Sequence, residues 1–100
     1  MEEVIQEIKN KVGNDPTKLF QEGMELLKYG QFETAIAIFE ELKNDYRNTA
    51  AILDALGLAY FMKEGHESKN AKENLMEAKR IAPDNQQIQE NLNYLLNNHQ

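Results

Sequence analysis

An all-α fold of stacked, antiparallel helical hairpins is predicted by three features of this sequence. Apolar residues recur at helical spacing in six segments, and no segment alternates as a strand would. The composition, 41% hydrophobic and 28% charged with only two prolines, suits a small helical domain. Three positions also recur 34 residues later: Leu19 as Leu53, Gly23 as Gly57 and Leu26 as Tyr60. A period of that length is typical of repeated helical hairpins.

The N-terminal segment, residues 1–13, is predicted to form an amphipathic helix. Its apolar face comprises Val4, Ile5, Ile8 and Val12. Gly13 is suited to end this helix in a left-handed conformation. Asp15 then provides an N-cap and Pro16 fits the first helical position, so the next helix should run to about Tyr29.

Turn signals separate four further helices. Gly30 makes a tight turn, and three helices are then expected over residues 32–45, 49–63 and 69–81. Pro83 stops the third of these. Asp84 and Gln87 resemble a capping box that opens a last helix, which should end at about Asn97.

Residues 16–85 resemble two repeats of the tetratricopeptide repeat (TPR) family. The first copy has Leu19, Gly23, Leu26, Ala35, Phe39 and Leu42 at the family's positions, and the second has Leu53, Gly57, Tyr60, Ala71, Leu75, Ala78 and Pro83. Small residues recur where the paired helices must cross closely, at Gly23, Ala35, Gly57 and Ala71. The resemblance implies a right-handed α-solenoid of about six helices.

The resemblance also divides the chain. It implies a first TPR-like repeat at 16–49, a second at 50–85 with a two-residue insertion, and a capping helix and tail at 86–100. The insertion falls in residues 63–68, which we expect to form an exposed, mobile turn. Glu22 departs from the family pattern by replacing an apolar residue that would pack against a preceding repeat. We therefore expect either that the N-terminal helix sits differently from such a repeat, or that Glu22 lies at its edge near a lysine such as Lys9 or Lys11.

A second apolar stripe is predicted on each leading helix. Phe20, Met24 and Leu27 lie roughly 100° around the helix from the stripe that is predicted to face the partner helix, which comprises Leu19, Gly23 and Leu26. In TPR arrays the leading helices line the concave surface, so the resemblance implies a groove there. Its predicted apolar members are Phe20, Met24, Leu27, Leu58, Phe61 and Met62, and its polar members include Asp54 and Lys28.

Such a groove suits the binding of another polypeptide. Methionine and phenylalanine adapt to varied apolar surfaces, so we expect the hydrophobic side of an amphipathic helix or an extended apolar peptide as the partner. The sequence therefore predicts a protein-interaction adaptor. The alternative is a structural self-association module, including a homodimer, whose groove is filled by its own or a second chain's N-terminal helix.

Other function classes find little support in the residues. A net charge of −6 with two arginines argues against nucleic-acid binding. No apolar run is long enough for a membrane span, no signal peptide is recognisable, and the chain lacks cysteine, so we expect a cytoplasmic protein without disulfides. Ser68, His66 and His99 offer no nucleophile–base pair, so we expect neither an enzyme nor a cofactor or metal site.

Overall fold

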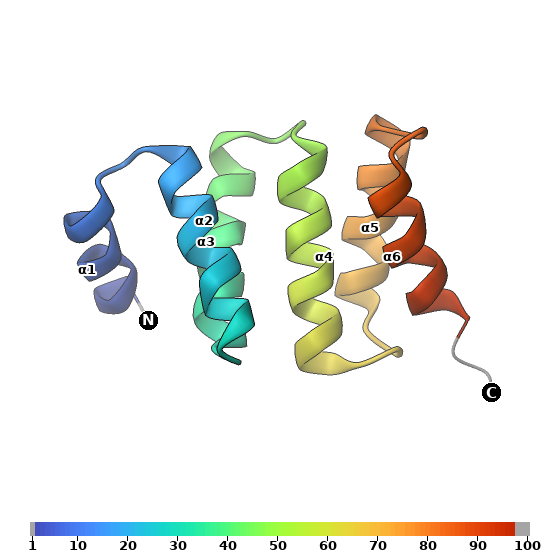
Figure 1. The fold of residues 1–100 in the computed structure, drawn as a ribbon, viewed down its shortest axis with the longest axis horizontal. Helices are drawn as coiled ribbons and strands as arrows, with labels where there is room; N and C mark the ends of the chain where they lie inside the picture. The colour runs from blue at the N-terminus through green and yellow to red at the C-terminus, as the bar shows by residue number, and fades with distance from the viewer. Residues whose placement is uncertain (1, 98–100) are drawn as a thin grey trace.

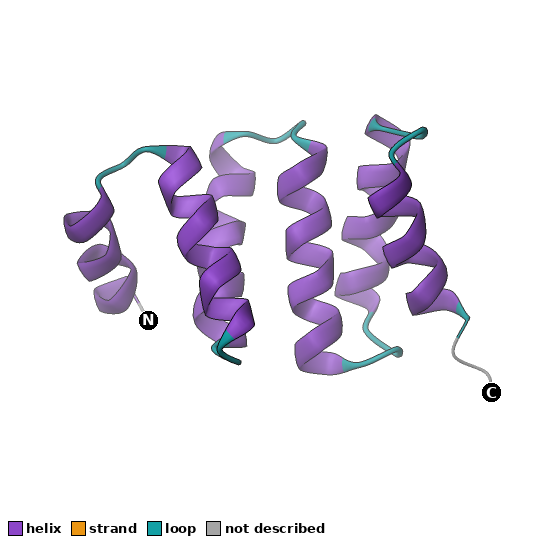
Figure 2. Ribbon diagram, in the orientation of Figure 1, coloured by secondary structure: helices purple, strands orange, loops and turns teal. Residues whose placement is uncertain are grey.

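The computed structural model describes residues 2–97, and this part of the chain forms six α-helices without strands (Figures 1 and 2). The helices are α1 (Glu2–Val12), α2 (Pro16–Lys28), α3 (Phe32–Asp45), α4 (Ala50–Glu64), α5 (Lys69–Ile81) and α6 (Gln86–Leu96). The predicted all-α class with six helices is confirmed. The handedness of the stack stays a prediction.

The helices form a row two layers deep. In Figure 1, α2, α4 and α6 lie nearer the viewer, and α3 and α5 lie behind them. The row measures 43 × 25 × 18 Å along its principal axes, so it is much longer than it is thick. Among residues 2–97, helix α1 stands at one end and contacts only α2 and α3, while α5 and α6 form the other end.

Local signals in the sequence set most of the helix ends. Gly13 and Gly30 have φ values of 78° and 79°, as the predicted left-handed turns require. The Asp15 side chain accepts a hydrogen bond of 2.9 Å from the Thr17 amide, and Pro16 begins α2. These predicted ends are confirmed.

The N-cap of α6 differs from the prediction. Asn85, rather than Asp84, caps this helix, because its side-chain oxygen accepts a hydrogen bond of 3.0 Å from the Ile88 amide. Asn85 has the extended backbone that an N-cap needs, with φ −76° and ψ 114°. The helix therefore begins one residue later than a cap at Asp84 would give.

Two glycines allow the paired helices to approach closely. A Cβ atom built on Gly23 would lie 2.6 Å from Cε1 of Phe39, and one built on Gly57 would lie 2.6 Å from Cγ of Leu75. Ala35 and Ala71 are fully buried at the same helix pairs. The prediction that small residues stand where the paired helices cross is confirmed.

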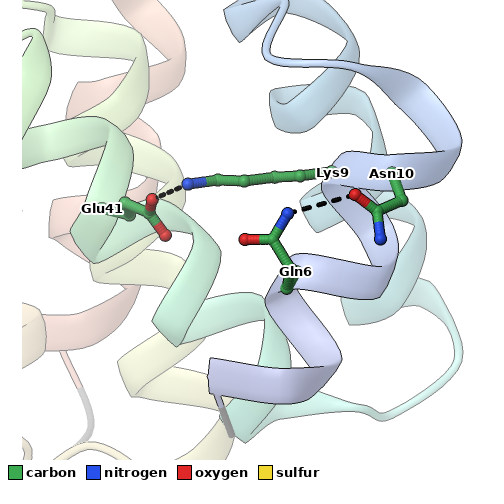
Figure 3. Close-up of polar contacts among 4 residues, drawn as sticks. All are labelled: Gln6, Lys9, Asn10 and Glu41. Atoms are coloured by element: carbon green, nitrogen blue, oxygen red, sulfur yellow. Dashed lines mark hydrogen bonds and ion pairs between the residues drawn. The ribbon is translucent and has the colours of Figure 1, made fainter.

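Helix α1 packs against α2 and α3 and so covers the side of this helix pair that faces away from α4. Its half-buried Ile5, Ile8 and Val12 pack against the core formed by α2, α3 and α4, whereas Val4 is exposed, contrary to the predicted four-residue face. Lys9 reaches across to form an ion pair with Glu41 of α3, while Gln6 and Asn10 hydrogen-bond within α1 (Figure 3). No ion pair joins Glu22 to Lys9 or Lys11 among the described residues, and Lys9 pairs with Glu41 instead.

The inserted turn is packed against α6 rather than exposed. Ser68 is buried; its hydroxyl accepts a hydrogen bond of 3.0 Å from the Ala71 amide at the start of α5 and donates one to Glu64. Nδ1 of half-buried His66 lies 3.1 Å from the carbonyl oxygen of Leu95. The expectation of an exposed turn is thus wrong for its central residues, because α6 supplies a surface on which they pack.

Candidate partner-binding groove

A hollow of about 510 Å³ lies across the layer formed by α2, α4 and α6. All three helices run in the same direction, since each is followed by an antiparallel neighbour or ends the row (Figure 1). The hollow lies mainly on the N-terminal halves of α4 and α6 and beside the middle of α2. It is lined by Phe20, Met24, Ala51, Asp54, Ala55, Leu58, Asn85, Gln87, Ile88 and Asn91. We call these ten residues the groove.

Four of the predicted binding residues line this groove: Phe20, Met24, Asp54 and Leu58. Phe20 is half-buried, with its ring tilted against that of Phe39 at a centroid distance of 5.6 Å. Met24 is 39% exposed, so its thioether is available to a partner. The core therefore fixes one of these two side chains and leaves the other free to adapt.

Leu27 does not belong to the groove. It is buried in the core with Leu19 and Gly23, whereas Leu26, predicted to face inward, is only half-buried. The buried residues of α2 thus follow a spacing of four, so the inward stripe matches the prediction at its first two positions and differs by one residue at the third. Placing Leu27 among the binding residues is therefore wrong.

Phe61, Met62 and Lys28 also lie outside the groove, because they stand near the C-terminal ends of their helices. The ring of Phe61 packs against His66 and Tyr94, at centroid distances of 4.7 and 5.5 Å. Met62 is exposed, and Lys28 Nζ lies 5.8 Å from the ring centroid of Tyr29. The hollow is therefore shorter along the helix axes than the predicted set of binding residues.

Helix α6 and its N-cap contribute four residues to the groove, although the sequence predicted only a capping role for this helix. Asn85, Gln87, Ile88 and Asn91 complete one wall of the groove. Helix α6 follows α5 antiparallel and contacts α4 as well, so it lies in the same layer as α2 and α4 and one of its faces borders the hollow. The position of residues 86–96 directly after α5 was therefore the signal in the sequence that could have placed them beside the groove.

Asp54 is the only charged residue among those that line the groove. Its Oδ1 accepts a hydrogen bond of 2.8 Å from Nδ2 of Asn91 on α6. Burial raises the pKa of the Asp54 carboxyl, and the hydrogen bond from Asn91 opposes that rise only in part. The groove therefore holds a partly desolvated carboxylate between apolar side chains.

The chain's own N-terminal helix does not fill the groove. Helix α1 makes no contact with α4 or α6 in the described residues, and it buries its apolar side chains at the end of the row. Intramolecular cover of the groove, one form of the predicted alternative, is therefore excluded for this arrangement of the chain.

The described residues do not gather metal ligands, and two of the residues considered for catalysis make structural contacts. Across residues 2–97, no three histidine, aspartate or glutamate side chains gather as metal ligands would. No helix in that range is long and apolar enough to cross a membrane. Of the residues considered for catalysis, Ser68 and His66 have the structural contacts given above, and His99 lies outside the described residues.

No protein-family model, curated protein or solved structure matches this chain.

Proposed function

We propose that this chain is a TPR-like interaction adaptor that binds an apolar peptide or the apolar face of an amphipathic helix in the groove. The observation that carries this proposal is the open hollow across three parallel helices, in which Phe20, Met24 and Leu58 offer apolar surface. A cytoplasmic, non-enzymatic protein is the corresponding expectation from the sequence.

The composition of the groove supports a peptide rather than a small polar ligand. Phenylalanine, leucine and methionine supply apolar contact area, and the unbranched methionine side chain changes shape at low cost. The polar members stand mainly on α6, at one wall, where they suit the polar edge of an amphipathic segment. An amphipathic helix bound in the groove would therefore suit both the apolar residues on α2 and α4 and the polar residues on α6.

Self-association remains the competing proposal. A second chain's N-terminal helix would have to leave its own place on α2 and α3 before entering the groove, giving up the burial of Ile5, Ile8 and Val12 and the Lys9–Glu41 ion pair. That exchange replaces one apolar contact by another of similar size. It therefore offers less net gain than an outside partner does.

The proposal is tested with peptides selected from a random 16-residue library displayed on phage. We expect the wild-type chain to select peptides that bind with micromolar affinity, and Met24→Glu to weaken their binding at least tenfold, because it places a charge in the apolar contact. Binding is measured by fluorescence anisotropy, and folding by circular dichroism.

Met76→Glu is the matched control, because Met76 is also an exposed methionine, 48% accessible, but lies on α5 outside the groove. It should leave peptide affinity unchanged. Failure to select peptides, or equal effects of the two substitutions, would remove the groove as the binding site. If light scattering shows that the wild-type chain is a dimer and that Met24→Glu is a monomer, self-association would be favoured instead.

A further inference from the structure

Asp54 lies at a place where a carboxylate is costly to the isolated chain. It is half-buried on α4, beside the apolar Ala51, Ala55 and Leu58, and burial raises the pKa of its carboxyl. A leucine or alanine at this position would extend the apolar surface without that cost. The hydrogen bond from Asn91 requires an acceptor oxygen at this position, but an uncharged amide oxygen would also accept it, so it does not account for the charge.

The described part of the chain does not neutralise this carboxylate. The ion pairs are Lys9–Glu41, Lys63–Glu33 and Arg80–Glu77, and none involves Asp54. No lysine or arginine lines the groove. Asn91 donates to Oδ1, and no described residue donates a hydrogen bond to Oδ2.

The net charge of the whole molecule also favours a cationic partner. The sequence has 17 acidic and 11 basic residues, for a net charge of −6, so the long-range field attracts cations. Among the described residues that line the groove, Asp54 carries the one charge, and it lies between apolar side chains and polar amides. A cation brought there by an apolar segment would be partly shielded from water, where its attraction to the carboxylate is stronger than at an open surface.

We propose that the segment bound in the groove is an apolar segment that carries a lysine or arginine, whose cationic group pairs with Oδ2 of Asp54 while apolar neighbours contact Phe20, Met24 and Leu58. This inference rests on the proposed function and specifies the partner's chemistry. Anionic and purely apolar segments would bind less well, because each leaves the half-buried carboxylate without a counter-charge.

The test compares peptides that the wild-type chain, Asp54→Asn and Glu73→Gln select from the same phage-displayed 16-residue library. Asp54→Asn keeps an oxygen that accepts from Asn91 but removes the charge. Glu73→Gln is the matched control, because it changes net charge equally at an exposed position on α5 outside the groove. We expect the wild type and Glu73→Gln to enrich one lysine or arginine among apolar residues, and Asp54→Asn to lose that enrichment.

A second measurement uses the tightest peptide from the wild-type selection. Replacing its basic residue by glutamine should weaken binding to the wild type about tenfold, as for a charge-assisted hydrogen bond, and leave binding to Asp54→Asn within about twofold. The wild-type affinity should also fall as salt rises, and that of Asp54→Asn should fall less.

The outcomes separate this inference from the proposed function. Peptides that require Met24 but lack a basic residue, or that bind Asp54→Asn as tightly as the wild type, would overturn the cationic partner and leave the groove as a binding site. Peptides insensitive to Met24→Glu, or the absence of any selected peptide, would overturn both. Enrichment of acidic residues by the wild type would also refute the pairing with Asp54.

Discussion

Leu75 occupies the space that a side chain at position 57 would need. A Cβ atom on Gly57 would lie 2.6 Å from Cγ of Leu75 and 3.2 Å from the carbonyl oxygen of Ala71. The neighbours are a fully buried branched carbon and a backbone atom, so neither can move aside cheaply. The close packing of α4 against α5 therefore requires glycine, which has no Cβ atom, at position 57.

Gly57→Ala should destabilise the fold, although alanine is favoured over glycine in an isolated helix by about 1 kcal/mol. We expect a net loss of about 1–3 kcal/mol, because the added methyl group overpacks the contact with Leu75. Urea denaturation followed by circular dichroism measures this change.

The double variant Gly57→Ala with Leu75→Ala gives the control. If the two side chains clash, the double variant should be more stable than the sum of the two single effects allows. Strict additivity, or a stabilising Gly57→Ala, would contradict the assigned contact.

His66→Ala should loosen α6 more than the other helices. The substitution removes both the contact of the imidazole with Phe61 and Tyr94 and its hydrogen bond to the Leu95 carbonyl oxygen. We expect a loss of about 1–2 kcal/mol, from one hydrogen bond and the aromatic contacts. Native-state hydrogen exchange should show faster exchange in residues 92–96, while the amides of α2 and α3 keep their protection. Uniformly faster exchange would refute a local role.

Tyr60→Phe should reveal a stability contribution that disappears at high pH. The Tyr60 hydroxyl donates a hydrogen bond of 2.6 Å to Oε2 of Glu40, and burial together with this bond raises the pKa of Tyr60 far above 10.0. Because the folded state holds this proton more tightly, the contribution is complete below pH 10 and is lost as the pH rises above it.

Near neutral pH we therefore expect Tyr60→Phe to be about 1 kcal/mol less stable than the wild type. The difference should shrink above pH 10, since only the wild type loses this contribution there. Urea midpoints measured from pH 8 to 11 on both proteins test the trend, and a constant difference would argue against it.

Asp54→Asn should be as stable as the wild type or more stable at pH 7. Since burial raises the folded-state pKa of Asp54 above 3.8, the favourable contribution of this carboxyl is present below pH 3.8 and is lost as the pH rises through the raised value. We expect a gain of about 0.5 kcal/mol for the variant at pH 7 and a smaller one at pH 3.5. Denaturant midpoints at the two pH values measure it, and a marked loss at pH 7 would show that Asp54 stabilises the chain.

The helices were predictable because local signals define them. The structure reproduces α3 and α5 over the expected residues, since Gly30 and Pro83 mark boundaries that short-range chemistry sets. The close helix crossings were predictable for a similar reason. Gly23 and Gly57 recur at positions where only the absence of a side chain lets two helices meet.

The candidate site was predictable only in part, because it depends on rotation and docking. A step of three or of four residues after Gly23 decides whether Leu26 or Leu27 is buried in the core, and periodicity does not distinguish the two. The packing of His66 depends on the Leu95 carbonyl oxygen, 29 residues away. Such long-range contacts leave no local pattern to recognise.

The end position of α1 has a consequence for the lifetime of the groove. Helices in a row are stabilised by their neighbours, so the outermost members open first and opening spreads inward. None of the side chains of α1 is fully buried, whereas α6 buries Ile88, Leu92 and Leu95. Fraying from this end should therefore begin at α1 and reach the groove only when α2 also opens, so smaller fluctuations of the N-terminal helix leave the binding surface intact. At the other end of the row α6 is itself a wall of the groove, and there the deeper burial of its side chains protects the binding surface.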